Sequence, residues 1–173
     1  MNEDAKKSNI ILIGMPGVGK STIGVILAKI LGYRFIDSDL LIQEQEQCLL
    51  KNIIDREGVE GFLAIENQVN ANICAEHAVI ATGGSAIYGS EAMAHLKEIG
   101  ITVYLQLSYH PLSTRLNNIR GRGVVLKPGQ SLEDLYAERI PLYESYADII
   151  LNVEDLSVES TLSALTHRLE LYV

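Results

Sequence analysis

Short apolar segments alternate with longer segments of helical periodicity along the chain. Five short segments have the length and composition of buried β-strands, namely residues 10–13, 34–36, 78–81, 101–107 and 149–153. Apolar residues recur at helical spacing over residues 20–31, 40–50, 53–57, 59–76, 90–99, 111–119, 132–146 and 158–172. Strands that alternate with helices favour an α/β fold, so we expect a five-stranded parallel sheet with helices on both faces.

Individual residues predict where several of these elements begin and end. Gly32 is placed to end the first helix as a C-cap, and Asp39 to begin the helix over residues 40–50 as an N-cap. Gly58 is expected to separate two helices. Pro141 is expected to kink or break the helix over residues 132–146, because proline cannot donate a backbone hydrogen bond.

The segment between the first strand and the first helix, residues 14–21, reads GMPGVGKS. It matches the phosphate-binding loop pattern in the required strand-to-helix context. Glycines let backbone amides curl around a phosphate, and the helix N-terminus favours the same anion. Lys20, expected to be exposed, can reach the terminal phosphates, and the Ser21 hydroxyl can bind Mg²⁺. The expected ATP contacts in this loop are Gly14, Gly17, Val18, Gly19, Lys20, Ser21 and Thr22.

Polar residues also follow the second and third predicted strands. Asp37 and Asp39 should face the phosphate-binding loop, because functional loops gather at the carboxyl ends of parallel strands. One carboxylate can hold Mg²⁺ with Ser21 and the other can act as a general base, although turn and cap roles alone also suit aspartate. Gly83 and Gly84 let a substrate approach the backbone closely, or form an ordinary turn.

Residues 120–130 predict a loop that can act as a lid. The segment contains glycines, a proline and the cations Arg120, Arg122 and Lys127. Phosphoryl transfer needs cations at the migrating group, and a loop that closes over ATP can supply one while excluding water. A solvated surface loop is the alternative interpretation.

Composition narrows the classes of partner. The chain has 173 residues, which suits one domain, and carries 22 acidic and 14 basic residues for a net charge of −8. A basic field is therefore lacking, which argues against nucleic-acid and anionic-membrane binding. Residues 1–9 have no signal-peptide core and no apolar run approaches a membrane span, so we expect a cytoplasmic protein. Cys48 and Cys74 fit no metal-binding spacing and are expected to be reduced thiols.

Four stretches together resemble shikimate kinase, over most of the chain. They are the phosphate-binding loop with its helix start at 14–24, Phe-Ile-Asp-Ser-Asp at 35–39, the glycine pair at 83–84, and Glu-Arg-Ile-Pro-Leu-Tyr at 138–143. The resemblance implies a P-loop, nucleoside-monophosphate-kinase-like fold with a substrate-binding helical region at about 39–77 and a lid at about 120–130. It implies transfer of the ATP γ-phosphate to a hydroxyl of shikimate, giving shikimate 3-phosphate, by a protein that we expect to be a monomer.

The resemblance also implies roles for individual residues. Lys20 would bind the β- and γ-phosphates, and Ser21 with Asp37 would organise Mg²⁺. Asp39 would hydrogen-bond the substrate hydroxyls and serve as the base. The remaining roles would be the lid arginine at the phosphates for Arg122, a contact with adenine for Arg115, the substrate wall for Gly83 and Gly84, and the substrate carboxylate for Arg139.

The chain departs from the family pattern on the acceptor side. Leu63 stands where the family usually has an arginine that clamps the shikimate carboxylate, and Ser85 stands at the third glycine. Glu66 has thereby lost its expected partner, and Arg56 is a nearby cation able to compensate. Two alternatives stay open: a related kinase for another polyol or sugar acid such as gluconate, and a nucleotide-binding module without turnover. The retained Lys20 speaks against the second.

Overall fold

The computed structural model describes residues 7–117 and 124–172. Its strands are β1 (Asn9–Ile13), β2 (Arg34–Asp37), β3 (Ala78–Ala81), β4 (Gly100–Gln106) and β5 (Ile149–Asn152). They form one five-stranded sheet in the order β2-β3-β1-β4-β5, and every pairing is parallel. β1 and β3 are buried along their whole length, as expected for central strands covered on both faces. The predicted parallel α/β sheet is confirmed.

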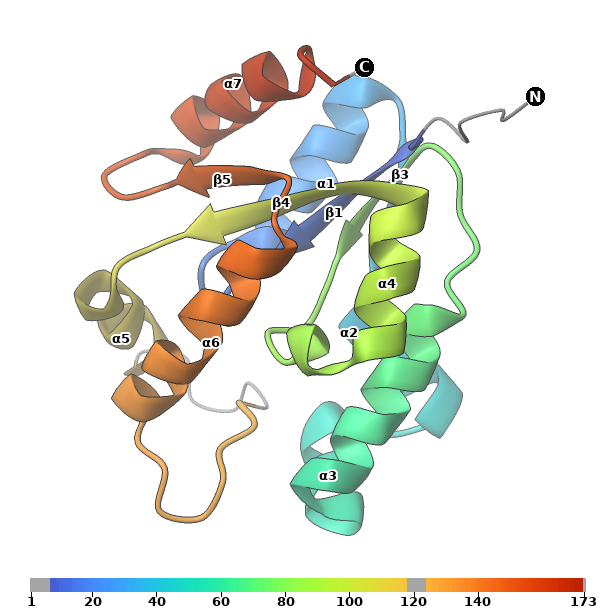
Figure 1. Ribbon diagram of the computed structural model, residues 1–173, viewed down its shortest axis with the longest axis vertical. Helices are drawn as coiled ribbons and strands as arrows, with labels where there is room; N and C mark the ends of the chain where they lie inside the picture. Colours follow the sequence, from blue (N-terminus) through green and yellow to red (C-terminus); the bar gives the residue numbers. More distant parts are fainter. Residues whose placement is uncertain (1–6, 118–123, 173) are drawn as a thin grey trace.

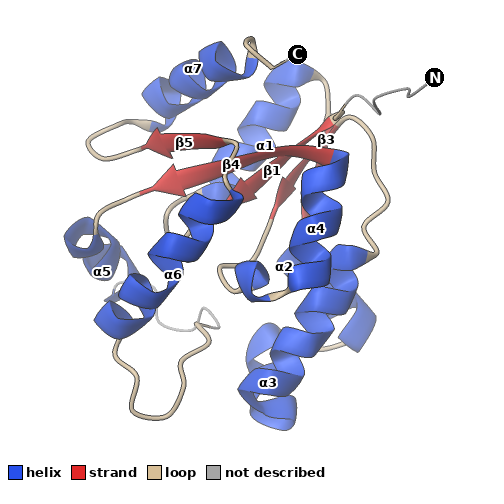
Figure 2. Cartoon of the chain, viewed as in Figure 1, coloured by secondary structure: helices blue, strands red, loops and turns tan. Residues whose placement is uncertain are grey.

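Helices cover both faces of this sheet (Figures 1 and 2). Figure 1 shows α1 (Lys20–Leu31) behind the sheet, with α4 (Ser90–Ile99) and α6 (Leu132–Tyr146) in front of it. The helix α3 (Leu50–Ala71) extends below the sheet and packs against α2 (Ser38–Glu46) and α4. The other helices are α5 (Tyr109–Asn117), α7 (Val158–Leu169) and the short 3₁₀ helix η1 (Ala86–Tyr88). Among the described residues, no helix combines the length and the apolar character needed to cross a bilayer.

Three helix boundaries test the sequence predictions. Gly32 ends α1 in the left-handed conformation, and Gly58, with φ 71°, interrupts α3, so both predictions are confirmed. The predicted Asp39 cap is wrong: α2 begins at Ser38, and the N-cap is Asp37, whose side chain accepts a hydrogen bond from the Asp39 amide at 3.0 Å. A break at Pro141 is also wrong, since α6 is one continuous helix.

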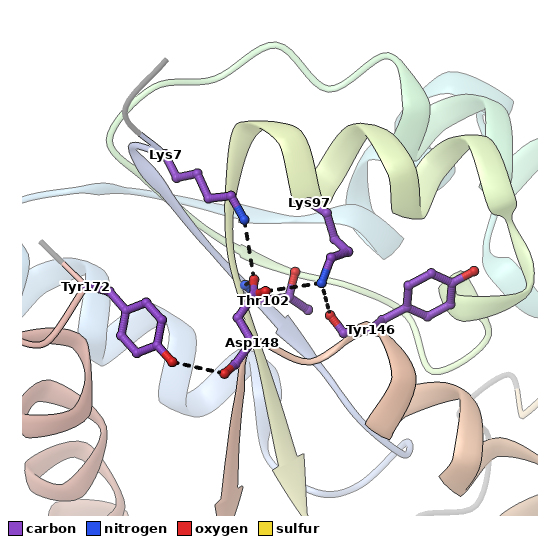
Figure 3. Close-up of polar contacts among 6 residues, drawn as sticks. All are labelled: Lys7, Lys97, Thr102, Tyr146, Asp148 and Tyr172. Carbon is purple, nitrogen blue, oxygen red and sulfur yellow. Dashed lines mark hydrogen bonds and ion pairs between the residues drawn. The ribbon is translucent and has the colours of Figure 1, made fainter. Parts of the chain in front are cut away.

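A polar network connects the amino ends of β4 and β5 (Figure 3). These ends lie away from the loops that follow the carboxyl ends of the strands. The Asp148 carboxylate accepts hydrogen bonds from the Thr102 amide at 2.9 Å and from Lys97 Nζ at 3.1 Å. Lys7 Nζ lies 3.6 Å from the same carboxylate, and the Tyr172 hydroxyl donates to the Asp148 carbonyl at 3.1 Å. One residue therefore joins two strands, a helix and both ends of the described chain.

We expect Asp148→Asn to destabilise the fold by about 1–3 kcal/mol at neutral pH, because it removes a charged acceptor from this network. Partial burial raises the pKa of Asp148, but the Thr102 amide and the two lysines outweigh it and hold the pKa below the usual value. The stabilisation is therefore present above the ordinary aspartate pKa and is lost as the pH falls through the lowered value. Urea unfolding at several pH values measures it.

The matched control for this prediction is Asp155→Asn, the same chemical change in an exposed turn residue. It should leave the free energy of unfolding within about 0.5 kcal/mol of the parent. Equal effects of the two substitutions at neutral pH would show that the Asp148 network adds no stability.

Candidate active site

The phosphate-binding loop joins β1 to α1 in the strained geometry that its glycines allow. Gly14, Gly17 and Gly19 have φ values of 146°, 82° and 110°, a region that side-chain-bearing residues rarely adopt. A Cβ on Gly14 would also lie only 2.8 Å from the Leu105 carbonyl oxygen of β4. The backbone can therefore curl around an anion only because these positions lack side chains.

Lys20 lies inside this loop rather than on the surface. Only 8% of Lys20 is exposed, so the prediction of an exposed lysine is wrong. Its ammonium donates hydrogen bonds to the carbonyl oxygens of Gly14 at 2.7 Å and Met15 at 2.9 Å. These two hydrogen bonds hold the ammonium against the beginning of the loop, just after β1.

A hydroxyl and a carboxylate meet beside the loop. Ser21 Oγ donates to Asp37 Oδ2 at 2.8 Å, which joins the first turn of α1 to the end of β2. Hard oxygen donors of this kind suit Mg²⁺, which is usually bound by few protein ligands and by substrate phosphates. Among the described residues, no group of three or more histidine, cysteine or acidic side chains is arranged to hold a metal ion.

Asp39 and the Gly83–Gly84 pair lie on one wall of a cleft of about 740 Å³ that also includes the phosphate-binding loop. Asp39 Oδ1 lies 2.7 Å from the position that a Cβ on Gly83 would occupy. Any side chain at Gly83 would therefore displace the carboxylate. This geometry places the Asp39 carboxylate directly beside the glycine pair.

Arg139 and Tyr143 reach Gly84 from successive turns of α6. Arg139 Nη1 lies 2.9 Å from the Cβ position of Gly84, and the buried Tyr143 hydroxyl donates to the Gly84 carbonyl at 2.6 Å. Burial raises the pKa of Tyr143, so its hydroxyl stays a proton donor. Arg139 is 1% exposed, and its Nε has no hydrogen-bond partner among the described residues. The sequence identified Arg139 but not the contact between Tyr143 and Gly84.

Ser85 and Glu66 form a buried hydrogen bond that the sequence analysis missed. Ser85 Oγ donates to Glu66 Oε2 at 2.5 Å, joining the loop after β3 to α3. Glu66 had been expected to lack a partner where Leu63 replaces an arginine. The two departures from the family pattern are therefore connected, because the serine at the third glycine position supplies a partner for the glutamate. The unusual Ser85 was the available signal.

Neither Leu63 nor Arg56 is among the described residues that line the cleft, although the sequence suggested a position near the substrate for both. Leu63 is half-buried against an apolar cluster that includes Ile53 and Phe62, and it is not among the described residues that line the cleft. Arg56 is an exposed residue whose guanidinium donates to Glu46 and Glu57 at 2.7 and 2.5 Å. The expectation that Arg56 compensates at the cleft therefore finds no support in its position. The basic residues on the described cleft wall are Lys20, Lys51 and Arg139.

The remaining predicted cations either are not among the described residues that line the cleft or lie outside the described part of the chain. Arg115 of α5 borders the phosphate-binding loop, where its Nη1 donates to the Val18 carbonyl at 3.4 Å. Lys127 is exposed and lies 3.8 Å from Glu138 of α6. Arg120 and Arg122 lie outside the described residues.

A family model described as shikimate kinase matches residues 16–170. The chain belongs to the shikimate kinase family. It is 36% identical over 170 residues to a shikimate kinase of Colwellia psychrerythraea, a match covering 96% of this chain and 99% of that one. A Vibrio cholerae shikimate kinase is also 36% identical, over 172 residues, with 98% and 99% covered.

Solved shikimate kinases share the fold. The Acinetobacter baumannii enzyme, solved in complex with shikimate, has a TM-score of 0.82 and 31% identity, with 94% of this chain and 92% of that one covered. The Aquifex aeolicus enzyme has a TM-score of 0.79 and 28% identity, with 94% and 96% covered. Membership of the shikimate kinase family makes the chain an ATP-dependent phosphotransferase acting on an alcohol group, which confirms the predicted class of enzyme.

Proposed function

We propose that this protein transfers the γ-phosphate of ATP to a hydroxyl of shikimate, giving ADP and shikimate 3-phosphate. The observation that carries the proposal is the shared cleft. Lys20 of the phosphate-binding loop lines this cleft, and so do Asp39 and Arg139, which lie at the two adjacent glycines Gly83 and Gly84. A phosphate donor and an anionic acceptor can therefore meet at Asp39.

The proposed division of roles follows from this arrangement. Lys20 stabilises charge on the transferred phosphoryl group, and Asp39 accepts the proton of the attacking hydroxyl. Arg139, whose planar guanidinium matches a carboxylate, binds the acid group of shikimate. Ser21 and Asp37 would hold Mg²⁺, which when bound neutralises charge on the phosphates. Arg115 and the lid arginine Arg122 stay proposals for the nucleotide, the latter on sequence alone.

The proposed organisation is one kinase domain with a substrate-binding helical region at about 39–77 and a lid at about 120–130. Support for the first comes from Phe62 and Glu66 of α3, which line the cleft beside Asp39 of α2. Val125 supports the second, because it lies at the cleft and packs into the same apolar cluster as Phe62.

An acceptor panel tests this function. ADP release is measured with Mg²⁺ and ATP in the presence of shikimate, quinate, gluconate or a simple polyol. We expect shikimate to give the highest kcat/KM. Turnover with gluconate or a polyol but not with shikimate would show that shikimate is not the acceptor. If no compound of the panel supports ADP release, a nucleotide-binding module without turnover is favoured.

We expect Tyr143→Phe to raise the KM for shikimate about two- to tenfold with little change in the KM for ATP. The substitution removes one buried hydrogen bond to the Gly84 carbonyl, worth about 0.5–1.5 kcal/mol. It therefore loosens the part of the cleft formed by Asp39, Glu66, Gly83 and Gly84, which we call the acceptor wall. Steady-state kinetics with each substrate varied in turn measures the effect. Tyr146→Phe, which removes a hydroxyl from the same helix, is the matched control. A larger change in the KM for ATP than for shikimate would contradict this role.

Leu63 itself does not line the cleft, so this prediction requires the longer arginine side chain to reach the cleft from α3. In that case we expect Leu63→Arg to lower the KM for shikimate about tenfold or more without changing the KM for ATP. A hydrogen bond to a charged group contributes about 1.5–3 kcal/mol, and leucine supplies none. Leu63→Met, a change of similar size without charge, controls for repacking of the half-buried site.

Lys51 is the cation of α3 among the described residues that line the cleft, so it is the alternative partner for the shikimate carboxylate in that experiment. If Lys51 already binds the shikimate carboxylate, Lys51→Met raises the KM for shikimate and Leu63→Arg gives no improvement. A KM for shikimate that is low in the parent and rises in Leu63→Arg would contradict the reading of Leu63.

A further inference from the structure

The Glu66 carboxylate lies in the cleft wall with its two oxygens in different surroundings. Glu66 is 1% exposed, and its Oε2 accepts the hydrogen bond from Ser85 Oγ. Its Oε1 has no hydrogen-bond partner among the described residues. Burying a charged carboxylate oxygen without a hydrogen-bond partner costs free energy, so the protonation state of Glu66 should depend strongly on the groups around it.

Glu66 Oε1 and Asp39 Oδ1 converge on the same backbone position. They lie 2.6 and 2.7 Å from the point where a Cβ on Gly83 would stand. Two carboxylates brought together in this way disfavour double ionisation, because like charges repel strongly where water is excluded. The acceptor wall therefore contains one carboxylate proposed as the base and a second one that the reaction does not use.

The charged groups that face Glu66 come from three helices. Burial and the charge of Asp39 on α2 raise the pKa of Glu66, whereas the Ser85 hydrogen bond, Arg139 on α6 and Lys20 on α1 oppose the rise, and the pKa is about 7. Tyr143 also lies near Glu66 but stays neutral, since burial raises its own pKa. The net charge of the acceptor wall therefore changes within the neutral pH range.

We propose that Glu66, held by Ser85, is a specificity-determining residue that sets the affinity of the cleft for an anionic acceptor. With an uncharged Glu66 the wall carries a single acidic charge, at Asp39, together with the cation Arg139, and it accepts a hydroxy acid. With an ionised Glu66 the wall carries two negative charges and repels the same ligand. This inference rests on the proposed function.

The first test is the pH dependence of the KM for shikimate at saturating Mg²⁺ and ATP, from about pH 6 to about pH 8.5. In the parent, the KM should rise roughly fivefold between about pH 7 and about pH 8 if only the uncharged form binds the acceptor. The KM for ATP should change little. Glu66→Gln should abolish the rise, and Glu159→Gln, an exposed residue of α7, should keep it.

Ser85→Gly should shift the pH at which the KM for shikimate rises, and the direction of this shift tests the proposal. The serine hydrogen bond favours the ionised carboxylate, so its removal should move the rise in KM to higher pH. A KM that does not depend on pH in the parent, a rise that persists in Glu66→Gln, or a shift to lower pH in Ser85→Gly would each overturn the proposal.

A measurement without turnover separates this inference from the proposed function. Since the pKa of Glu66 rises from 4.5 to about 7 on folding, its contribution to stability is complete below pH 4.5 and is lost as the pH rises through 7. The difference in Tm between the parent and Glu66→Gln should therefore fall between about pH 5 and about pH 8. A constant difference would overturn the titration of Glu66. A falling difference without shikimate turnover would overturn the proposed acceptor instead.

Discussion

Lys20→Met is expected to lower kcat by about 10²–10³-fold or more while the KM for shikimate changes little. The ammonium lies inside the phosphate-binding loop, where it can neutralise charge on the transferred phosphoryl group. Removal of one such preorganised group costs this much in other enzymes. Methionine keeps the apolar stem, whereas alanine would also leave a cavity, because Lys20 is buried. Steady-state ADP release measures the effect.

The control for Lys20→Met is Lys29→Met, the same change at an exposed position of the same helix. It should retain the parent kcat. The Tm of Lys20→Met should stay within a few degrees of the parent, because the Gly14 and Met15 carbonyls lose one shared donor. Parent-like turnover in folded Lys20→Met would exclude the phosphate-binding role of this loop.

Asp39→Asn is expected to lower kcat by about 10²-fold or more, the usual size of a general-base effect. The amide keeps the shape of the side chain and its contact with Gly83 but cannot accept the hydroxyl proton. ADP binding, measured by calorimetry, should match the parent. Asp55→Asn, an exposed change on α3, is the control. A kcat within threefold of the parent would show that another group, or no group, accepts the proton.

The fold was predictable because the strand segments are short, apolar and bounded by turn residues. The phosphate-binding loop was predictable for the same reason, since its residues are contiguous and its flanking elements are clear. The cap of α2 was not: Asp37 and Asp39 flank Ser38, and both residue types suit an N-cap. Only the backbone direction at the end of β2 decides which carboxylate bonds to the helix.

The acceptor-binding part of the cleft was less predictable from the sequence, because it depends on contacts between distant segments. Ser85 and Glu66 are 19 residues apart, and their hydrogen bond depends on where the loop after β3 meets α3. The burial of Lys20 depends on how tightly the loop closes around it, which composition does not determine. Continuity of α6 through Pro141 is also a tertiary effect, since the buried Arg139 and Tyr143 on either side anchor the helix.

The position of Asp148 has a consequence for protein engineering. Lys7 and Tyr172 both reach this residue, so the two ends of the described chain lie close together, at the amino ends of β4 and β5 (Figure 3). Proximity of this kind favours circular permutation, in which a short linker joins the old ends and new ones open in a surface loop. Because the cleft lies beyond the opposite ends of the strands, such a linker, or a probe attached through it, would leave the acceptor path open.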